Sequence, residues 1–304
     1  MSRIITTDDG SQYQKASVAK SYGGIMAGSV AQTGMLLSSE LLAARFMNKM
    51  KKLHQGVDTL EIKSALEKAL TDSGAAANGT KIVDYAGVEA KSTVDFIGNK
   101  MEKLFAKKVK FSDLNPKKLW KKGIKFINDI IHNEIKLGNN AAYDPELNKV
   151  FINTQKLGLS GFHEAGHSLN ATTSKFWRVI QKLRLPGMLA AAGISLIALY
   201  KRPKAKGEKP KNFIDRATDF IKNNAGKLTL FAFVPVVAEE LKATARGNKM
   251  AKQIKTLSPE IVKKVAKTNR CGAMTYLLLA AGMALAAVSG SKVRDAITKP
   301  KQVA

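Results

Sequence analysis

The sequence predicts a mainly α-helical protein with a small β element and transmembrane helices. Residues 271–291 form an uncharged, largely apolar run that is long enough to cross a bilayer as a helix. Residues 116–137 carry apolar side chains at helical spacing. Residues 149–153, which follow a turn at Asp144-Pro145-Glu146-Leu147-Asn148, read as a short strand.

The amino-acid composition indicates what kind of partner the protein is expected to bind. The 304 residues allow one large or two modest domains, and 50 Lys and Arg against 24 Asp and Glu give a net charge of +26. Such a charge favours anionic surfaces, either lipid headgroups or nucleic acid. We expect membrane lipids, because the chain has no zinc-finger cysteine pairs, aromatic RNA-binding motif or helix-turn-helix signature. Its single cysteine excludes an intrachain disulfide, and two early acids argue against a cleaved signal peptide.

The N-terminal region, residues 1–110, is expected to be mostly helical. It contains an uncharged segment, residues 21–39, that is long enough to cross a membrane but only weakly hydrophobic because it is rich in Gly and Ser. The next region, residues 111–182, opens with the basic amphipathic helix at 116–137. That helix could lie on a membrane surface or pack on its own protein, and the sequence leaves both open.

A five-residue motif in the region 111–182 predicts a metal site. Residues 163–167 read His-Glu-Ala-Gly-His, and on a helix positions i and i+4 share one face. His163 and His167 can therefore reach one metal ion, and Glu164 can polarise a water molecule there. Ser160 is the expected N-cap. Gly166 suits a close approach by another segment or substrate, or ordinary tight packing.

A catalytic zinc site needs a third protein ligand, usually His or a carboxylate. Glu239 and Glu240 close the apolar run 228–238, where an unpaired carboxylate is costly to bury. A metal would supply a partner for one of them, although the pair could also mark the emergence of a helix into water. Ala243 and Ala245 keep this helix thin enough to approach the motif helix.

At these residues the chain resembles the gluzincin peptidases, in which a Glu-x-x-Ala-(Asp/Ser/Thr) pattern follows the HExxH motif. Residues 240–244, Glu-Leu-Lys-Ala-Thr, fit that pattern. The resemblance is to the HtpX-like and YugP-like membrane zinc peptidases and covers about residues 140–250. It implies an α+β zincin-like catalytic core with one Zn2+ per chain, Glu240 as third ligand and Glu164 as general base. It also implies that Thr244, in a place where the family often has Asp, supports a ligating histidine by a hydrogen bond.

The resemblance assigns a substrate role as well. In gluzincins an edge strand before the motif helix pairs with the extended substrate backbone, and Val150 to Asn153 would do that here. Glu239 remains the fallback ligand, because neighbouring helix positions point about 100° apart and only one carboxylate can face the metal.

The region 183–238 is expected to form a hydrophobic helical hairpin. Its arms are residues 185–200 and 228–238, and its loop, residues 201–227, is strongly basic. If both arms cross a bilayer, the two histidines and Glu240 emerge on the same side, as a shared metal requires. A soluble all-α protein with buried apolar helices is the alternative.

The remaining regions complete the expected organisation. Residues 239–270 would hold the third-ligand helix and a following helix, and residues 271–304 a C-terminal transmembrane helix with a basic tail. The predicted function is a membrane-integral zinc metalloendopeptidase acting on protein or peptide substrates. The resemblance places its active site on the cytoplasmic side. The alternative is a non-catalytic basic membrane or scaffold protein with an incidental or structural metal site.

Overall fold

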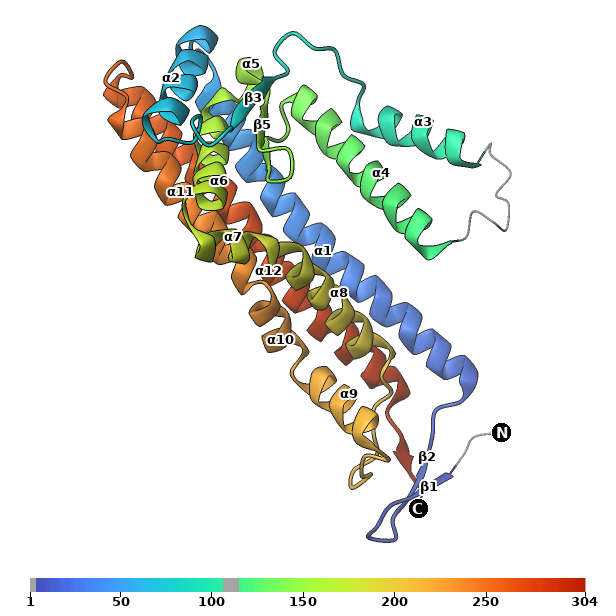
Figure 1. Cartoon of the computed structure of the whole chain (residues 1–304). Helices are drawn as coiled ribbons and strands as arrows, with labels where there is room; N and C mark the ends of the chain where they lie inside the picture. The colour runs from blue at the N-terminus through green and yellow to red at the C-terminus, as the bar shows by residue number, and fades with distance from the viewer. Residues whose placement is uncertain (1–3, 106–114, 304) are drawn as a thin grey trace. The chain divides into compact units, whose positions relative to one another are not determined.

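The computed structural model describes residues 4–105 and 115–303, and within them the protein is mainly helical with two small sheets. This confirms the coarse fold class. The chain, whose helices and strands are labelled in Figure 1, divides into two compact units. Unit 1 comprises Met1–Arg45, Val179–Ala238 and Met274–Ala304, and unit 2 comprises Phe46–Arg178 and Glu239–Ala273.

Three long helices contribute residues to both units. They are α1 (Val18–His54), α11 (Val234–Gln253) and α12 (Pro259–Thr298). Each unit therefore consists of chain segments that are distant from one another in sequence.

Unit 2 is built on a three-stranded sheet and the helices packed around it. Its strands are β3 (Lys81–Asp84), β4 (Ala142–Asp144) and β5 (Lys149–Ile152). Its helices are α2 (Thr59–Asp72), α3 (Thr93–Phe105), α4 (Pro116–Leu137), α5 (Thr154–Leu157) and α6 (Gly161–Thr173). The amphipathic helix expected at 116–137 is therefore present as α4.

The strand order in this sheet is β3-β5-β4. β5 runs parallel to β3, with Val83 opposite Phe151, and antiparallel to β4, with Tyr143 opposite Val150. The strand predicted at 149–153 forms, and it lies in the middle of the sheet.

The apolar core of unit 2 surrounds the motif helix. α2 begins at an effective cap, because the Asp58 side chain accepts hydrogen bonds from the backbone N–H groups of Leu60 and Glu61. It buries one face at helical spacing against α6 and the second half of α11. The buried residues of this cluster include Ile62, Leu66, Leu159, Phe162, Met250, Ile254 and Val265.

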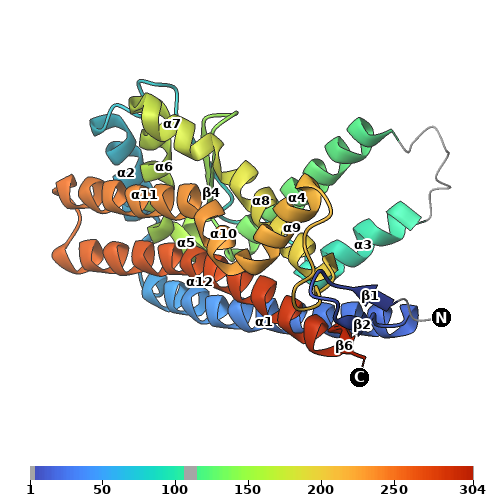
Figure 2. The same ribbon diagram turned by 90° about the horizontal axis from the view of Figure 1, so that it is seen from below.

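Unit 1 consists of helices with a small terminal sheet. Besides the first part of α1 and the last part of α12, it contains α8 (Arg184–Tyr200), α9 (Phe213–Asn223) and α10 (Ala225–Ala232). The short α7 (Lys175–Lys182) crosses the division between the units. The sheet joins β1 (Ile4–Thr6), β2 (Gln12–Gln14) and β6 (Lys301–Gln302), where α1 begins and α12 ends (Figure 2).

Among the described residues, two helical stretches are long and apolar enough to cross a membrane, residues Lys175–Tyr200 and Pro259–Thr298. They contain the first predicted hairpin arm and the predicted C-terminal span. The second arm, 228–238, is not one continuous helix, because α10 ends at Ala232 and α11 restarts with Pro235 in its first turn. The basic loop between the arms contains the amphipathic helix α9, which the sequence analysis did not anticipate.

Candidate metal centre

The motif histidines lie one turn apart on the same face of α6, as the i, i+4 spacing requires. Their ring centroids are 4.6 Å apart, and His167 is only 3% exposed. Neighbouring Phe162 and Ala165 are fully buried in the apolar core, and this packing holds the helix in place. Ser160 occupies the N-cap position as predicted but does not cap, because its hydroxyl donates to the Leu157 carbonyl oxygen instead.

α6 and α11 approach each other closely because each has a glycine at the contact. A Cβ on Gly166 would lie 2.1 Å from the carbonyl oxygen of Ala243, closer than any real contact. A Cβ on Gly247 would lie 2.3 Å from the carbonyl oxygen of Phe162. The glycine between the two histidines therefore serves close helix packing, which was one of its two predicted roles.

This approach brings the carboxylate of Glu240 to the two histidines. Its Oε2 atom lies 2.9 Å from His163 Nε2 and 3.6 Å from His167 Nε2. The two Nε2 atoms are themselves 3.0 Å apart. Glu240 is 1% exposed, so all three side chains meet in a buried place.

Glu239 and Thr244 hold the outer nitrogens of the two imidazoles. A Glu239 carboxylate oxygen lies 2.7 Å from His167 Nδ1, and Asn170 Nδ2 donates to Glu239 over 3.0 Å. Thr244 Oγ1 lies 3.1 Å from His163 Nδ1. Both predicted glutamates thus reach the centre, at different atoms.

These outer contacts indicate which nitrogen of each neutral imidazole ring carries the hydrogen. The Thr244 hydroxyl donates to the Asn269 carbonyl oxygen over 3.3 Å, which leaves its oxygen to accept a hydrogen bond from His163 Nδ1. The carboxylate of Glu239 likewise requires a hydrogen on His167 Nδ1. In the neutral rings both Nε2 atoms then carry bare lone pairs, and these face Glu240.

Three electron-rich atoms in contact require a cation between them. Burial by itself lowers the pKa of His167, but the charges of Glu239 and Glu240 and their hydrogen bonds outweigh it and raise the pKa to about 10. A proton on His167 therefore serves as that cation in the absence of metal. The buried side chains at this centre form two overlapping groups that could hold a metal ion: His163, Glu164 and His167, and His167, Glu239 and Glu240.

The Glu164 carboxylate lies close to both histidines but is not hydrogen-bonded to either of them. One of its carboxylate oxygens and one nitrogen from each histidine all lie within 4.8 Å of one another. Its side chain makes no hydrogen bond or ion pair within the described part of the chain, and it is 8% exposed. This carboxylate is available to exchange a proton with a small molecule bound beside the histidines.

The predicted edge-strand role of Val150 and Asn153 requires correction. β5 is paired on both sides, so an incoming peptide cannot add to its backbone. Val150 is fully buried, and the Asn153 side chain caps α5 and donates to the carbonyl oxygen of Lys136. The outer strand nearest the motif helix is β4, which contacts α6.

The remaining histidines are not at the centre. His54 Nε2 contacts the Gln155 carbonyl oxygen at 3.2 Å, and His132 Nδ1 contacts the Tyr85 hydroxyl at 3.1 Å. The sequence reasoning missed Asn170, which holds Glu239, and Asn269, which fixes the Thr244 hydroxyl. Asn170 could have been identified from the sequence, because it lies three residues after His167 and therefore on the same face of the helix.

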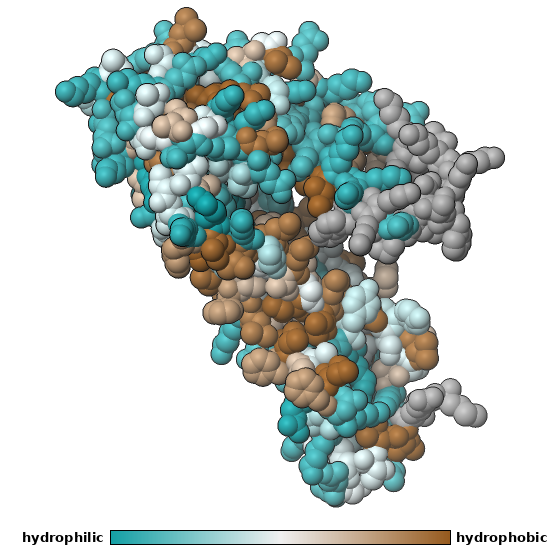
Figure 3. All heavy atoms as spheres, viewed as in Figure 1, coloured by the Kyte–Doolittle hydropathy of each residue, from teal (hydrophilic) through white to brown (hydrophobic). Residues whose placement is uncertain are grey.

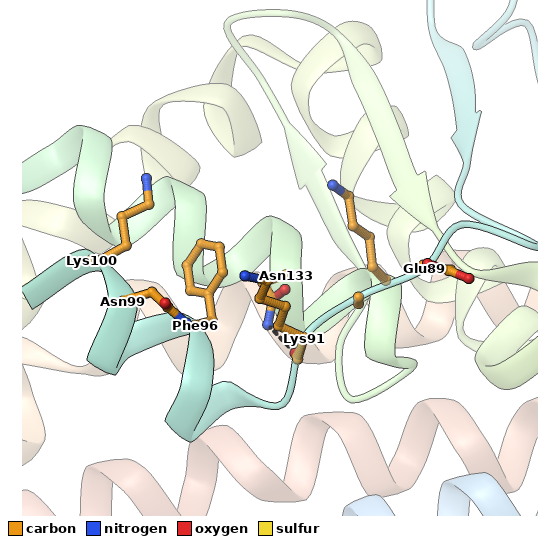
Figure 4. A pocket seen from close by; sticks show the side chains of 8 residues that line it. Glu89, Lys91, Phe96, Asn99, Lys100 and Asn133 are labelled. Atoms are coloured by element: carbon orange, nitrogen blue, oxygen red, sulfur yellow. Dashed lines mark hydrogen bonds between the residues drawn. The ribbon is translucent and has the colours of Figure 1, made fainter. Parts of the chain in front are cut away.

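A separate pocket of about 280 Å³ in unit 2 lies between residues 89–91, α3 and α4 (Figure 4). Several of its polar groups have partners in the protein. Asn133 donates to the Lys91 carbonyl oxygen over 3.0 Å, and Lys100 pairs with Asp129 and lies over the Phe96 ring. The pocket therefore gives no indication of a ligand.

Comparisons with protein-family models, curated proteins and solved structures give no match to this chain.

Proposed function

We propose that this protein is a membrane-associated zinc metalloendopeptidase. His163, His167 and Glu240 would hold one zinc ion, and Glu164 would be the general base. The observation that carries the proposal is the meeting of two histidine Nε2 atoms and a carboxylate oxygen beside Glu164, whose carboxylate has no hydrogen-bond partner among the described residues.

The donor set favours zinc over other common ions. Two imidazole nitrogens and one carboxylate are typical protein ligands of catalytic zinc, whereas Mg2+ and Ca2+ prefer oxygen ligands throughout. Tetrahedral ligand atoms at about 2.0–2.1 Å from zinc stand about 3.3 Å apart. The three separations of 2.9, 3.0 and 3.6 Å bracket that value.

The residues around the centre supply the remaining chemistry. When bound, zinc supplies Lewis-acid chemistry for polarising a water molecule and a peptide carbonyl. The Glu164 carboxylate accepts a proton from the attacking water and donates it to the nitrogen of the departing amine. Glu239 and Thr244 keep both imidazoles oriented with Nε2 inward, which preserves the donor set through the cycle.

An extended peptide substrate would bind beside β4. Among the described strands β4 pairs only with β5, so its other backbone edge can accept an added strand. β4 also contacts the motif helix, which would bring the substrate backbone near Glu164. Tyr143 on β4 donates its hydroxyl hydrogen to Asn148, so it would first have to release that bond to assist catalysis.

The membrane location rests on the two apolar helical stretches and on the charge. The metal-centre residues lie outside both candidate spans, so cleavage would occur near the membrane surface rather than within it. A net charge of +26 favours anionic lipids as the surrounding surface. An active site on the cytoplasmic side is part of the proposal on the resemblance alone.

Elemental analysis of the purified full-length chain tests the metal assignment. We expect about one zinc per chain in the wild type, as a single set of three protein ligands requires. Glu240→Ala should lose the metal, whereas Glu239→Ala should keep it with weaker affinity. Wild-type protein that folds but takes up no zinc when supplied with it would rule out the assignment.

Hydrolysis of an unstructured peptide tests the base. Glu164→Gln should keep its zinc and lose hydrolysis by about 10²–10⁴-fold, the usual contribution of a positioned general base. Hydrolysis at the wild-type rate in that variant would contradict the role of Glu164. Zinc binding without hydrolysis in the wild type would favour a structural metal site in a non-catalytic membrane protein.

A further inference from the structure

The first part of α1, in unit 1, turns an apolar stripe outward. Its most exposed side chains recur mainly at four-residue spacing, and Val30 among them is 70% exposed. The stripe consists of Val18, Tyr22, Met26, Val30, Leu37 and Leu41. A helix on the surface of a soluble protein shows the opposite pattern, with charged and polar residues outward.

The inward face of this part of α1 is made of small residues that contact α12. A Cβ on Gly24 would lie 2.4 Å from Thr298 Cγ2, and one on Gly28 would lie 2.6 Å from the Gly290 carbonyl oxygen. From the other helix, a Cβ on Gly282 would lie 2.3 Å from Ser39 Oγ. The two helices therefore run antiparallel in continuous close contact.

Polar side chains also point inward. Gln32 Nε2 donates to the carbonyl oxygen and the hydroxyl of Ser195 on α8, over 3.3 and 3.2 Å. Small residues and polar side chains between helices, with apolar residues outside, are typical of helix packing in membranes, where lipid tails are as apolar as leucine. This part of α1 thus packs through small and polar residues and turns its apolar residues outward.

The length and ends of the segment fit a bilayer. Residues 21–39 carry no charge, and a helix of that length rises about 29 Å, close to the hydrocarbon thickness of about 30 Å. Lys20 precedes the segment and Glu40 follows it. Beyond Lys20, β2 pairs with β6, with Tyr13 opposite Gln302, so the beginning of α1 and the end of α12 lie at the same end of unit 1 (Figure 2).

We propose that residues 21–39 of α1 form a third membrane-spanning helix, whose outward stripe contacts lipid acyl chains. The stripe belongs to the same unit as α8 and the apolar part of α12, which are the candidate spans. Figure 3 shows apolar residues gathered over α8 and α10. The proposal extends the membrane location within the proposed function and does not depend on zinc or hydrolysis.

The sequence has a signal for this helix that mean hydropathy conceals. Gly24 and Gly28 form a G-x-x-x-G pattern within an uncharged segment, which is a membrane helix-packing motif. The same inward glycines, with Gln32 and Ser39, lower the average hydropathy of the segment. A helix that packs through small and polar residues therefore scores as weakly hydrophobic even though its outward face is apolar.

Spin-label accessibility measures what covers the stripe. The full-length chain carries a single cysteine, so a Cys271→Ala background accepts one nitroxide at a time, at Met26→Cys, Val30→Cys or Leu37→Cys. Leu60→Cys on α2 of unit 2 is the matched control, because Leu60 is apolar and 76% exposed. Each protein is reconstituted in nanodiscs of phosphatidylcholine and phosphatidylglycerol, and collisions with oxygen and with a water-soluble nickel chelate are compared.

We expect the ratio of oxygen to nickel accessibility to be several-fold higher at all three α1 positions than at Leu60, and highest at Val30 near the middle of the segment. Nickel accessibility at Val30 equal to that at Leu60 would place the stripe in water and overturn the proposal. Low accessibility to both reagents with spin–spin broadening would overturn it in favour of a second copy of the chain. Zinc content measured on the same samples reports on the metal centre separately.

Discussion

Unit 2 and unit 1 each contain a close contact between two helices, α6 with α11 in the first and α1 with α12 in the second. The two contacts have similar packing, but the residues around them differ in polarity. Both depend on glycines that let backbones touch, Gly166 and Gly247 in the first and Gly28 and Gly282 in the second. Around the first contact lies an apolar core that encloses charged groups. At the second, the outward face of α1 is apolar.

The difference teaches that glycine marks where helices approach, whereas the polarity around it identifies the solvent. In water, apolar burial drives helices together, and a close contact can then be used to bring Glu240 to the histidines. In lipid that driving force is absent, so small-residue packing and hydrogen bonds such as Gln32 to Ser195 must hold the helices. Substitutions at matched positions in the two units can separate these roles.

The largest expected effect is at the glycine between the two histidines. In Gly166→Ala the new Cβ would meet the Ala243 carbonyl oxygen at 2.1 Å, so α6 and α11 must separate. We expect zinc binding to be lost and the free energy of unfolding to fall by about 3 kcal/mol. Zinc per chain and denaturant-induced unfolding measure the two effects.

Gly123→Ala is the control for this variant, because a Cβ there meets nothing within 4 Å. That change should leave zinc binding intact and raise stability by up to about 1 kcal/mol through helix propensity. Equal zinc content in the two variants would show that the close approach of α6 and α11 is not needed for the centre.

A charge on the apolar stripe of α1 should cost almost as much. Val30→Lys places an ammonium group where we expect acyl chains, and a lysine at the centre of a spanning helix costs about 3 kcal/mol. The same substitution at Leu60, which is comparably exposed in unit 2, should change stability by less than about 0.5 kcal/mol. Thermal unfolding in nanodiscs compares the two, and equal effects would contradict a lipid-facing stripe.

The local part of the metal centre could be predicted from the sequence because helix geometry is local. The 3.6-residue period is enough to place His163 and His167 on one face of the helix. The pattern from Glu240 to Thr244 identified the facing residues, and both lie where that pattern implied. The structure places the two glutamates at different atoms, because Glu240 faces Nε2 of both rings whereas Glu239 contacts Nδ1 of His167.

The parts that could not be predicted depend on non-local pairing. A run of alternating apolar residues identifies β5 as a strand, but only the positions of β3 and β4 decide that it is central. Asn269 reaches Thr244 from a separate helix. The outward orientation of the apolar face of α1 likewise becomes visible only when its neighbours on α8 and α12 are known.

The charge of the metal-free centre should make stability depend on pH. Burial lowers the pKa of His167, but Glu239 and Glu240 raise it from its usual 6.5 to about 10. The protonated ring therefore stabilises the fold in full below pH about 6.5, and this stabilisation is lost as pH rises toward about 10. The slope is about 1.4 kcal/mol per pH unit within that window.

Thermal unfolding of chelator-treated protein between pH 7 and 9.5 measures this slope. Glu239→Gln removes one of the two charges that hold the proton, so its unfolding midpoint should fall less over the same range. Zinc-loaded protein should also fall less, because a metal ion replaces the proton. Identical slopes in all three samples would mean that His167 is not the titrating group.

The smallest expected effect is at the threonine that orients His163. Thr244→Val keeps the side-chain shape but removes the oxygen that accepts from His163 Nδ1, so the ring loses its fixed orientation. We expect zinc affinity to fall by about tenfold, the lower end for loss of a ligand-orienting partner. Thr268→Val is the matched control, because the Thr268 hydroxyl is buried and has no hydrogen-bond partner among the described residues. Competition with a chelating dye compares the two, and equal affinities would mean that the Thr244 hydroxyl does not position the histidine.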